Sequence, residues 1–480
     1  MVDCLTTPQE HSSIVSTGWG TAISWQRGCS FGCPEGITMR RFVAGLFVLA
    51  LWVGAAFAQD DVWRTQMTDG MSLYQQGRYA EAEEKFSAAL KEAEPFGPDD
   101  PRLASSLNNL ASLSAALGRA AQGEPLSRQA LAIREKALGT DHPDVAQSLD
   151  NLGSLLAAQG RYAQAEPLLR RALAIREKAL GPEHPDVAQT LNNLVELYRA
   201  RGKAAQAEPL CQRALAIQEK ALGPEHADVA TSLNNLAGVY LARGQYGRAE
   251  PLYRRALAIR EKALGPEHPL VATSLNNLGV LHLARGQVAE AEPLYKRALA
   301  IQEKALGPEH PQVATTLNNQ GLLLMIQGRY AEAEPLYKRA LTIDEKALGG
   351  EHPSVATDLN GLALLYAARN EAAQAEPLFR RALAIREKVL GPEHSDVATT
   401  LNNLGVLYHE QERYREAEPL FRRAQAIREK ALGLAHPDVA TTLENYAALL
   451  RKTKREKYAL EWEARAEAVR AKYARENPTK

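Results

Sequence analysis

Apolar and polar residues follow a pattern along most of the chain that returns every 42 residues. Its clearest landmark is Leu-Asn-Asn-Leu or a close variant of it. The first leucine of this landmark stands at Leu107, Leu149, Leu191, Leu233, Leu275, Leu317, Leu359, Leu401 and Leu443. A fixed period of this length is typical of a solenoid, which stacks one supersecondary unit many times.

The segment from Pro143 to Gly181 shows what one period contains. Apolar residues recur at helical spacing over residues 145–156 and predict a first helix of about four turns. Gly160 interrupts that helix. A second apolar series over residues 163–175 predicts a second helix, whose wet side is expected to hold Arg170, Arg171, Arg176, Glu177 and Lys178. Gly181-Pro182 ends it, because glycine can adopt the left-handed conformation and proline cannot continue a helix. Each period is therefore predicted to be a helical hairpin in an all-α protein.

One series of residues identifies a family. Leu401, Leu404-Gly405, Tyr408, Tyr414, Ala417, Phe421 and Ala424 together resemble the tetratricopeptide repeat, with its usual period lengthened to 42 residues. The form with Leu-Asn-Asn-Leu in the first helix and Ala249-Glu250-Pro251-Leu252-Tyr253 in the second is similar to the repeats of kinesin light chain. The resemblance implies a right-handed superhelical solenoid of about ten hairpins, making close to one superhelical turn or slightly more. It also implies that the first helices line an inner, concave surface that binds peptides.

The domain organisation follows from the limits of the repeat. We expect an irregular N-terminal capping hairpin over residues 59–100, eight regular repeats over residues 101–436, and a C-terminal capping hairpin and tail over residues 437–480. Both end hairpins are expected to act as caps because the ends of a solenoid need a polar outer face.

The segment before the repeat resembles a secretory signal. Met39-Arg40-Arg41 precedes an apolar run from Phe42 to Gly54, and Ala56-Phe57-Ala58 follows it. A positive start, a short apolar stretch and a small-residue site are the parts of a signal peptide, here residues 39–58 with cleavage after Ala58. Residues 1–38 are then a spurious or disordered extension. The expected location is periplasmic or secreted, and an uncleaved, membrane-anchored form is the alternative.

Charge and cysteine content narrow the choice of partners. The chain carries 57 Lys plus Arg and 57 Asp plus Glu, so it has no basic surplus that would favour nucleic acid. A membrane partner is expected only if the signal segment is retained. After cleavage one cysteine, Cys211, is left, and its place in the repeat is that of a packed core residue.

No spacing in the chain is typical of catalysis, of a metal site or of cofactor binding, so neither catalytic residues nor a cofactor are expected. Eight histidines occupy the same turn between repeats: His142, His184, His226, His268, His310, His352, His394 and His436. Equivalent positions of stacked repeats stand about 10 Å apart, too far for one metal ion to bridge. We expect these histidines to cap helices, with a pH-responsive surface as the alternative.

The asparagine pairs are the candidate binding residues. Viewed down a helix, both members of the pair lie about 100° or more from the centre of the apolar stripe, so neither is expected to face the hairpin core. Amides both donate and accept, so a ladder of them can pair with the backbone of an extended peptide. The candidates are Asn192, Asn193, Asn234, Asn235, Asn276, Asn277, Asn318, Asn319, Asn402 and Asn403. The alternative is that these amides fix the stacking of adjacent repeats.

The sequence thus predicts a non-enzymatic scaffold that binds an extended peptide or a protein surface in its concave groove. A structural module that assembles with itself is the alternative, and an unrecognised hydrolase is a more distant one. A monomer is the expected oligomeric state.

Overall fold

The computed structural model describes residues 59–476. The chain divides into two compact units after Val62, and the larger unit begins at Trp63. All regular elements among the described residues are helices. In the larger unit, helical residues 63–75 pair with α2 (Tyr79–Ala93), and a 3-10 turn, η1 (Glu94–Phe96), follows α2. The prediction of an all-α fold is confirmed.

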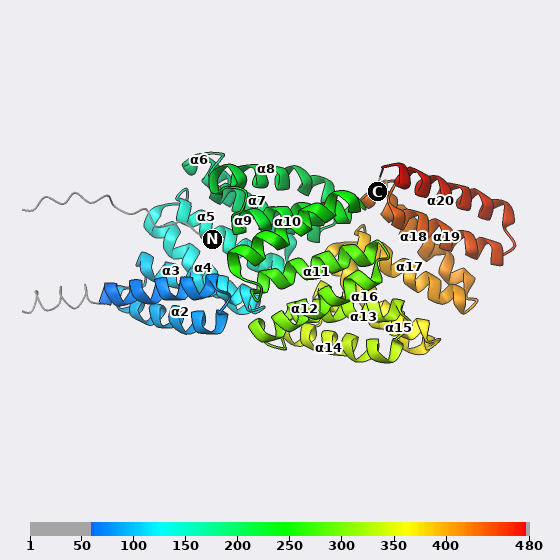
Figure 1. The fold of residues 1–480 in the computed structure, drawn as a ribbon, viewed down its shortest axis with the longest axis horizontal. Helices are drawn as coiled ribbons and strands as arrows, with labels where there is room; N and C mark the ends of the chain where they lie inside the picture. The colour runs from blue at the N-terminus through cyan, green and yellow to red at the C-terminus, as the bar shows by residue number, and fades with distance from the viewer. Residues whose placement is uncertain (1–58, 477–480) are drawn as a thin grey trace, which may run out of the picture. The chain divides into compact units, whose positions relative to one another are not determined.

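From α3 onward, helices of alternating length form consecutive antiparallel pairs (Figure 1). The hairpins are α3 (Pro101–Ala116) with α4 (Ala120–Leu138), α5 (Pro143–Ala158) with α6 (Tyr162–Leu180), α7 (Pro185–Ala200) with α8 (Ala204–Leu222), α9 (Ala227–Ala242) with α10 (Tyr246–Leu264), α11 (Pro269–Ala284) with α12 (Val288–Leu306), α13 (Pro311–Ile326) with α14 (Tyr330–Leu348), α15 (Pro353–Ala368) with α16 (Ala372–Leu390), α17 (Ser395–Glu410) with α18 (Tyr414–Leu432), and α19 (Pro437–Lys452) with α20 (Glu456–Glu476). The predicted solenoid of helical hairpins is confirmed.

The histidines between hairpins begin the first helices from α5 to α19. In each case Nδ1 of the ring accepts a hydrogen bond from the backbone N–H two residues later, as Asp186 N donates to His184 over 3.2 Å. The same bond is made by His142, His226, His268, His310, His352, His394 and His436. One otherwise unpaired donor at each helix start is satisfied in this way. The expected capping role is confirmed.

Small and large residues interlock between hairpins. The Tyr337 side chain of α14 is fully buried, and Gly361 of α15 lies against its ring, where a Cβ atom would come within 2.5 Å of Tyr337 Cε1. Gly321 of α13 also lies against this ring. A larger side chain at either glycine would have to displace a packed aromatic ring. The core therefore runs continuously from hairpin to hairpin.

The hairpins wind into a superhelix whose successive turns touch. His310 Nε2 lies 3.0 Å from the carbonyl oxygen of Ala116, 194 residues earlier. The same contact joins His268 to Gln75, His352 to Ala158 and His394 to Ala200, each over 3.0–3.2 Å and 193 or 194 residues. We call this line of contacts the seam. One superhelical turn therefore takes between four and five 42-residue repeats.

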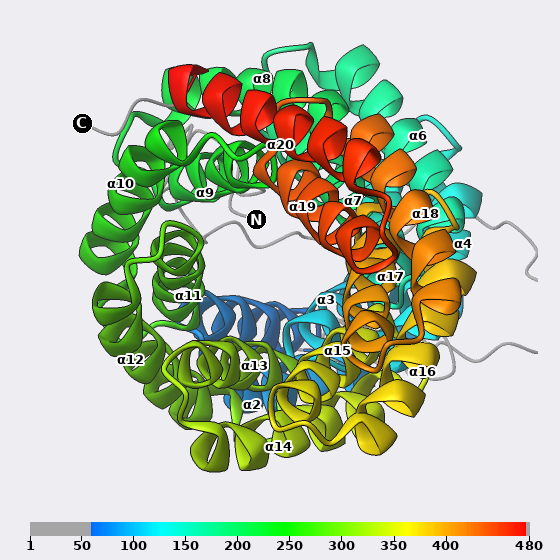
Figure 2. The same ribbon diagram turned by 90° about the vertical axis from the view of Figure 1, so that its right-hand side faces the viewer.

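The expectation of about one superhelical turn is wrong, because the unit makes about two turns. Figure 2 looks along the winding and shows α17 to α20 lying over the path of the earlier helices. At the C-terminal end Tyr473 of α20 continues the seam, since its hydroxyl donates to the Gly244 carbonyl over 2.7 Å.

Candidate functional site

The first helices of the hairpins form the inner side of the winding and the second helices form its outer side (Figure 2). On α13 the residues at inner-face spacing are Thr315, Asn319, Leu322 and Ile326, and all four keep partial or full exposure. The remaining faces of α13 pack against α12, α14 and α15. The equivalent stripes of the other first helices lie on the same inner side, and we call these stripes together the inner wall; on α9 two of its members, Asn235 and Gly238, are buried.

The two members of each asparagine pair have different surroundings. The first members are less than a tenth exposed: Asn192, Asn234, Asn276, Asn318 and Asn402. Among the second members, Asn193, Asn277, Asn319 and Asn403 are half-buried on the inner wall, and Asn235 is buried at 3 % exposure. The first members therefore lie between repeats, not on an accessible surface.

The pairs form a ladder of amide hydrogen bonds from one repeat to the next. Asn277 Nδ2 donates to Asn234 Oδ1 over 3.1 Å, and Asn319 Nδ2 donates to Asn276 Oδ1 over 3.0 Å. The same bond joins Asn235 to Asn192 and Asn403 to Asn360. In every case the second member of one repeat donates to the first member of the repeat before it. These bonds are those that the stacking alternative expects.

The second members keep hydrogen-bonding capacity for a ligand. Asn277 uses one Nδ2 hydrogen toward Asn234, and among the described residues its Oδ1 accepts no hydrogen bond. An amide can make up to four hydrogen bonds, so an acceptor and a donor are left over on the inner wall. Peptide binding by Asn193, Asn277, Asn319 and Asn403 stays a prediction, and stacking and binding are compatible at these positions.

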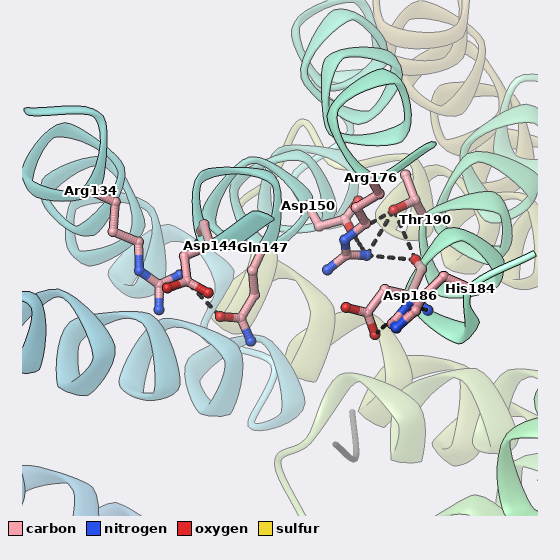
Figure 3. Close-up of polar contacts among 8 residues, drawn as sticks. All are labelled: Arg134, Asp144, Gln147, Asp150, Arg176, His184, Asp186 and Thr190. Atoms are coloured by element: carbon pink, nitrogen blue, oxygen red, sulfur yellow. Dashed lines mark hydrogen bonds and ion pairs between the residues drawn. The ribbon is translucent and has the colours of Figure 1, made fainter. Parts of the chain in front are cut away.

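A second polar ladder lies deeper, and the sequence pattern missed it. Arg176, expected on the wet side of its helix, is 2 % exposed. Asp150, which takes the place of the first asparagine in its repeat, is also 2 % exposed. Figure 3 shows the Arg176 guanidinium pairing with the Asp150 carboxylate and donating to Thr190 Oγ1. Arg134 makes the equivalent contact with Ser148 over 3.0 Å. The second helix of each hairpin contacts the next hairpin as well as its own partner, which is why this face is buried.

Burial affects the titration of this ladder. Desolvation raises the pKa of Asp150, and the Arg176 guanidinium and the Thr190 hydroxyl oppose that rise. Desolvation also lowers the pKa of Arg260, which occupies the position of Arg176 two repeats later, to about 10. Buried charges at these joints thus have partners from their own hairpin, such as Asp150 for Arg176, and from the next hairpin, such as Thr190.

The remaining candidate chemistry is structural. Cys211 is completely buried, and desolvation raises the pKa of its thiol to about 12, so it is a packed core residue, as expected. Within residues 59–476 no three His, Cys, Asp or Glu side chains are arranged to hold a metal ion. The described helices include none that is long and apolar enough to cross a membrane. The predicted signal segment lies outside the described residues.

Stacked helical hairpins with a continuous core and a polar ladder at each joint define an α-helical repeat solenoid. The sequence profile of the tetratricopeptide repeat matches residues 103–178, 151–208, 186–262, 232–304, 270–324, 312–388, 371–430 and 396–472, and a second tetratricopeptide profile matches residues 68–137. These matches span most of the chain, which belongs to the tetratricopeptide-repeat family.

Solved structures similar to this chain include repeats of a putative kinesin light chain from Podosopora anserina. Its identity is 33 %, it covers 43 % of this chain and 98 % of its own, and its TM-score is 0.34. BtubC from P. vanneervenii is 24 % identical over 50 % of this chain and 93 % of its own, with a TM-score of 0.38. A Rap protein complexed with Competence and Sporulation Factor is 16 % identical and covers 78 % of this chain and 99 % of its own. Its TM-score is 0.59, so it shares the fold. No curated protein matches the chain.

Proposed function

We propose that the protein is a non-enzymatic scaffold that binds an extended peptide or protein segment along its inner wall. The observation that carries this proposal is the spare acceptor and donor of second asparagines such as Asn277 and Asn319 on the accessible inner face. Among the candidates, four repeats present such an asparagine there, Asn193, Asn277, Asn319 and Asn403, whereas the position is a buried Asn235 on α9 and Gly361 on α15. An extended backbone presents donors and acceptors at regular intervals, and a ladder of amides can pair with them whatever the peptide's side chains are.

The character of the inner wall changes along the winding. The third position of the wall stripe is Glu196 on α7, Gly238 on α9, Val280 on α11, Leu322 on α13 and Leu364 on α15. The later helices therefore offer apolar contacts beside the asparagines. A peptide with apolar side chains toward one end fits this gradient, because burying them removes apolar surface from water.

Relatives of this fold support partner binding in general. Tetratricopeptide repeats typically serve protein–protein interaction, and the Rap protein of the same fold is complexed with Competence and Sporulation Factor. A solenoid of this kind can therefore hold a partner without a catalytic group of its own.

Site-specific photocrosslinking tests the proposal. A photoreactive amino acid is introduced at Thr315 or Thr357, which are exposed on the inner wall, and at Gln212 or Arg254, which are exposed on the outer helices α8 and α10. With extract of the source cells, the inner positions should capture a defined partner segment that the outer positions do not. Equal capture from both sides, or capture only from outside, would contradict the inner wall as the binding surface.

We also propose that the mature chain is exported and begins at Gln59, on the basis of the signal-like segment 39–58. Expression from Met39 in a Gram-negative host should yield a periplasmic protein whose N-terminal sequence starts at Gln59. Full-length protein in the cytosol would contradict export, and full-length protein bound to the membrane would support the anchored alternative.

A further inference from the structure

One joint of the solenoid differs from the other joints in its buried chemistry. At the joints between hairpins, a buried Arg or Gln of the second helix bonds a Ser or Thr hydroxyl of the next first helix. The contacts are Arg134–Ser148, Arg176–Thr190, Gln218–Ser232, Arg260–Ser274, Gln302–Thr316, Arg386–Thr400 and Arg428–Thr442, over 2.6–3.0 Å. Between α14 and α15 the two positions are Asp344 and Asp358. Asp344 thus stands where the other joints have Arg or Gln, and Asp358 stands where they have Ser or Thr.

The acid pair is enclosed by protein. Asp344 and Asp358 are each 2 % exposed and hydrogen-bond to one another, and Asn318 Nδ2 of α13 donates to Asp358 Oδ1. Within residues 59–476, Asp344 Oδ1 and Asp358 Oδ2 have no other donor that satisfies them. Two buried carboxylates in contact cannot both ionise without a large cost, so at least one of them must hold a proton.

Charged groups on the surrounding helices do not neutralise the pair. α13 has no ionisable side chain, and on α14 Glu345 pairs with Arg381 while Tyr337 adds a neutral hydroxyl. On α16 Arg386 donates to Thr357, Thr400 and the carbonyl of Asp396, the first acid of α17. Desolvation raises the pKa of Asp344 to about 7, and desolvation with the neighbouring Asp344 charge raises the pKa of Asp358 to about 8.

The turn at the same joint is less constrained than its neighbours. It reads Gly349-Gly350, where the turns at 181, 223, 265, 307 and 391 read Gly-Pro. Replacing proline by glycine frees the backbone, because the proline ring fixes φ. A surface cavity of about 320 Å³ lies at this turn, lined by Gly350, Arg381 and Lys388 among others. The turn also carries His352, whose Nε2 reaches the Ala158 carbonyl of the preceding superhelical turn over 3.0 Å.

We propose that the α14–α15 joint is a pH-sensitive hinge of the superhelix, closed while the Asp344–Asp358 pair holds its protons and opened when they pass to solvent. Opening lets water reach the carboxylates and separates the hairpin of α14 from the hairpin of α15. Because His352 belongs to the moving turn, opening also releases the seam at Ala158. The second superhelical turn can then move away from the first, which widens access to the inner wall.

The direction of the pH effect follows from proton linkage. In the open joint both carboxyls face water and have ordinary pKa values near 4, so the closed joint binds more protons than the open one above that pH. Opening therefore becomes more favourable as the pH rises from about 4 to about 8. The increase is at most about tenfold per pH unit for each proton released.

Hydrogen–deuterium exchange of the whole protein from about pH 5 to about pH 8 tests the hinge. After correction for intrinsic exchange rates, the protection factors at the facing ends of α14 and α15 should fall as the pH rises. The fall should be at most about tenfold per pH unit for each carboxyl that loses its proton. The equivalent ends of α12 and α13, joined by Gln302 and Thr316, serve as an internal control and should not change in this way. Equal behaviour of the two joints would overturn the proposal.

Variants separate the acid pair from the turn. D344Q/D358T copies the neighbouring joint and should remove the pH dependence, whereas G350P should reduce the extent of opening and leave the titration in place. A pH dependence that persists in D344Q/D358T would overturn the hinge. If that variant does not fold, infrared absorption of protonated carboxyl groups in the wild-type protein decides. A carboxyl band that persists at pH 6 and disappears by pH 9 supports the pair, and its absence at pH 6 overturns the proposal.

Discussion

The imidazole Nε2 of His310 lies 3.0 Å from the carbonyl oxygen of Ala116, although 194 residues separate them in the chain. His310 Nδ1 accepts the backbone N–H of Gln312, so the ring proton must sit on Nε2 and point at Ala116. One neutral side chain thus caps its own helix and joins two turns of the superhelix. The seam is therefore expected to stabilise the winding.

The first prediction separates the seam bond from the helix cap. Asparagine is also a good N-cap, so His310→Asn should keep the cap of α13 and lose the bond to Ala116. We expect a loss of about 0.5–1.5 kcal/mol in the free energy of unfolding, measured by urea titration. His184→Asn is the matched control, because the His184 side chain is 39 % exposed and caps α7 in the same way. Equal losses in both variants would show that the seam bond adds nothing.

The second prediction compares a glycine that lies under the seam with one that does not. A Cβ atom at Gly118 would stand 2.5 Å from Pro311 Cδ, whereas one at Gly328 would meet nothing within 4 Å. Both glycines have positive φ, +69° and +74°, so alanine strains the backbone about equally at the two sites, by roughly 1–2 kcal/mol. Gly118→Ala should lose a further 1–3 kcal/mol or so by pushing the turns apart. Thermal melts of the two variants measure the difference, and identical melting temperatures would contradict close packing at the seam.

The period of the sequence was enough to predict the hairpins, their helix ends and the capping histidines, because these depend on contacts within about one repeat. It could not predict the seam, since the number of hairpins per superhelical turn depends on a small rotation that accumulates over four to five repeats. The turn between the two helices of a hairpin has a glycine at residues 118, 160, 202, 244, 286 and 328, but Asn370 and Glu412 take its place in two later repeats. Both residues have φ near +60° and lie in the second superhelical turn, beyond the hairpins that a following turn covers.

Arg176 shows a second limit of the pattern. A charged residue beside an apolar stripe was assigned to solvent, but a solenoid helix packs against the next hairpin as well as its own. One feature of the sequence indicated that this position is buried. The position of Arg176 is occupied by uncharged Gln218 and Gln302 in other repeats, and by Asp344 in one. At a position exposed to solvent, exchanging Arg for Gln or Asp needs no change elsewhere. At a buried joint, each of these side chains needs a partner that suits its charge and hydrogen bonds. The sequence showed the candidate asparagines as a recurring pair, but it did not show that the two members have different environments.

The third prediction measures the asparagine ladder. Asn234→Ala removes the acceptor of Asn277 Nδ2, and Asn277→Ala leaves the buried Asn234 Oδ1 without that donor. Asn277→Ala should cost about 1–3 kcal/mol, because the buried Asn234 Oδ1 loses its partner. Asn234→Ala should cost less, about 0.5–1.5 kcal/mol, because the half-buried Asn277 amide keeps access to water. The double variant should cost less than the sum, with a coupling of about 0.5–3 kcal/mol from a double-mutant cycle of urea titrations. Additive losses would indicate that the amides do not interact.

The last prediction is the response of the seam to acid. Burial is the largest cause that lowers the pKa of the seam residues His268, His310 and His352, and of His436, whose ring lies near Gly244 of the preceding superhelical turn. These rings therefore stay neutral below the range in which a free histidine titrates. A folded-state pKa below the unfolded value contributes stability that is present above about pH 6.5 and is lost as the pH falls through the folded value. Protonation would place a hydrogen on Nδ1, so that this nitrogen could no longer accept the helix N–H. It would also place a positive charge beside the positive end of the helix dipole. The buried acid pair Asp344–Asp358 has raised pKa values and opposes this loss over the same range, so the measurement is made in the D344Q/D358T background. There the urea midpoint should fall between about pH 7 and pH 5, and changing these four histidines to Asn should flatten that fall. Changing the exposed His142 and His184 to Asn serves as the control, and a fall of equal steepness in the four-residue variant would assign the acid response to other groups.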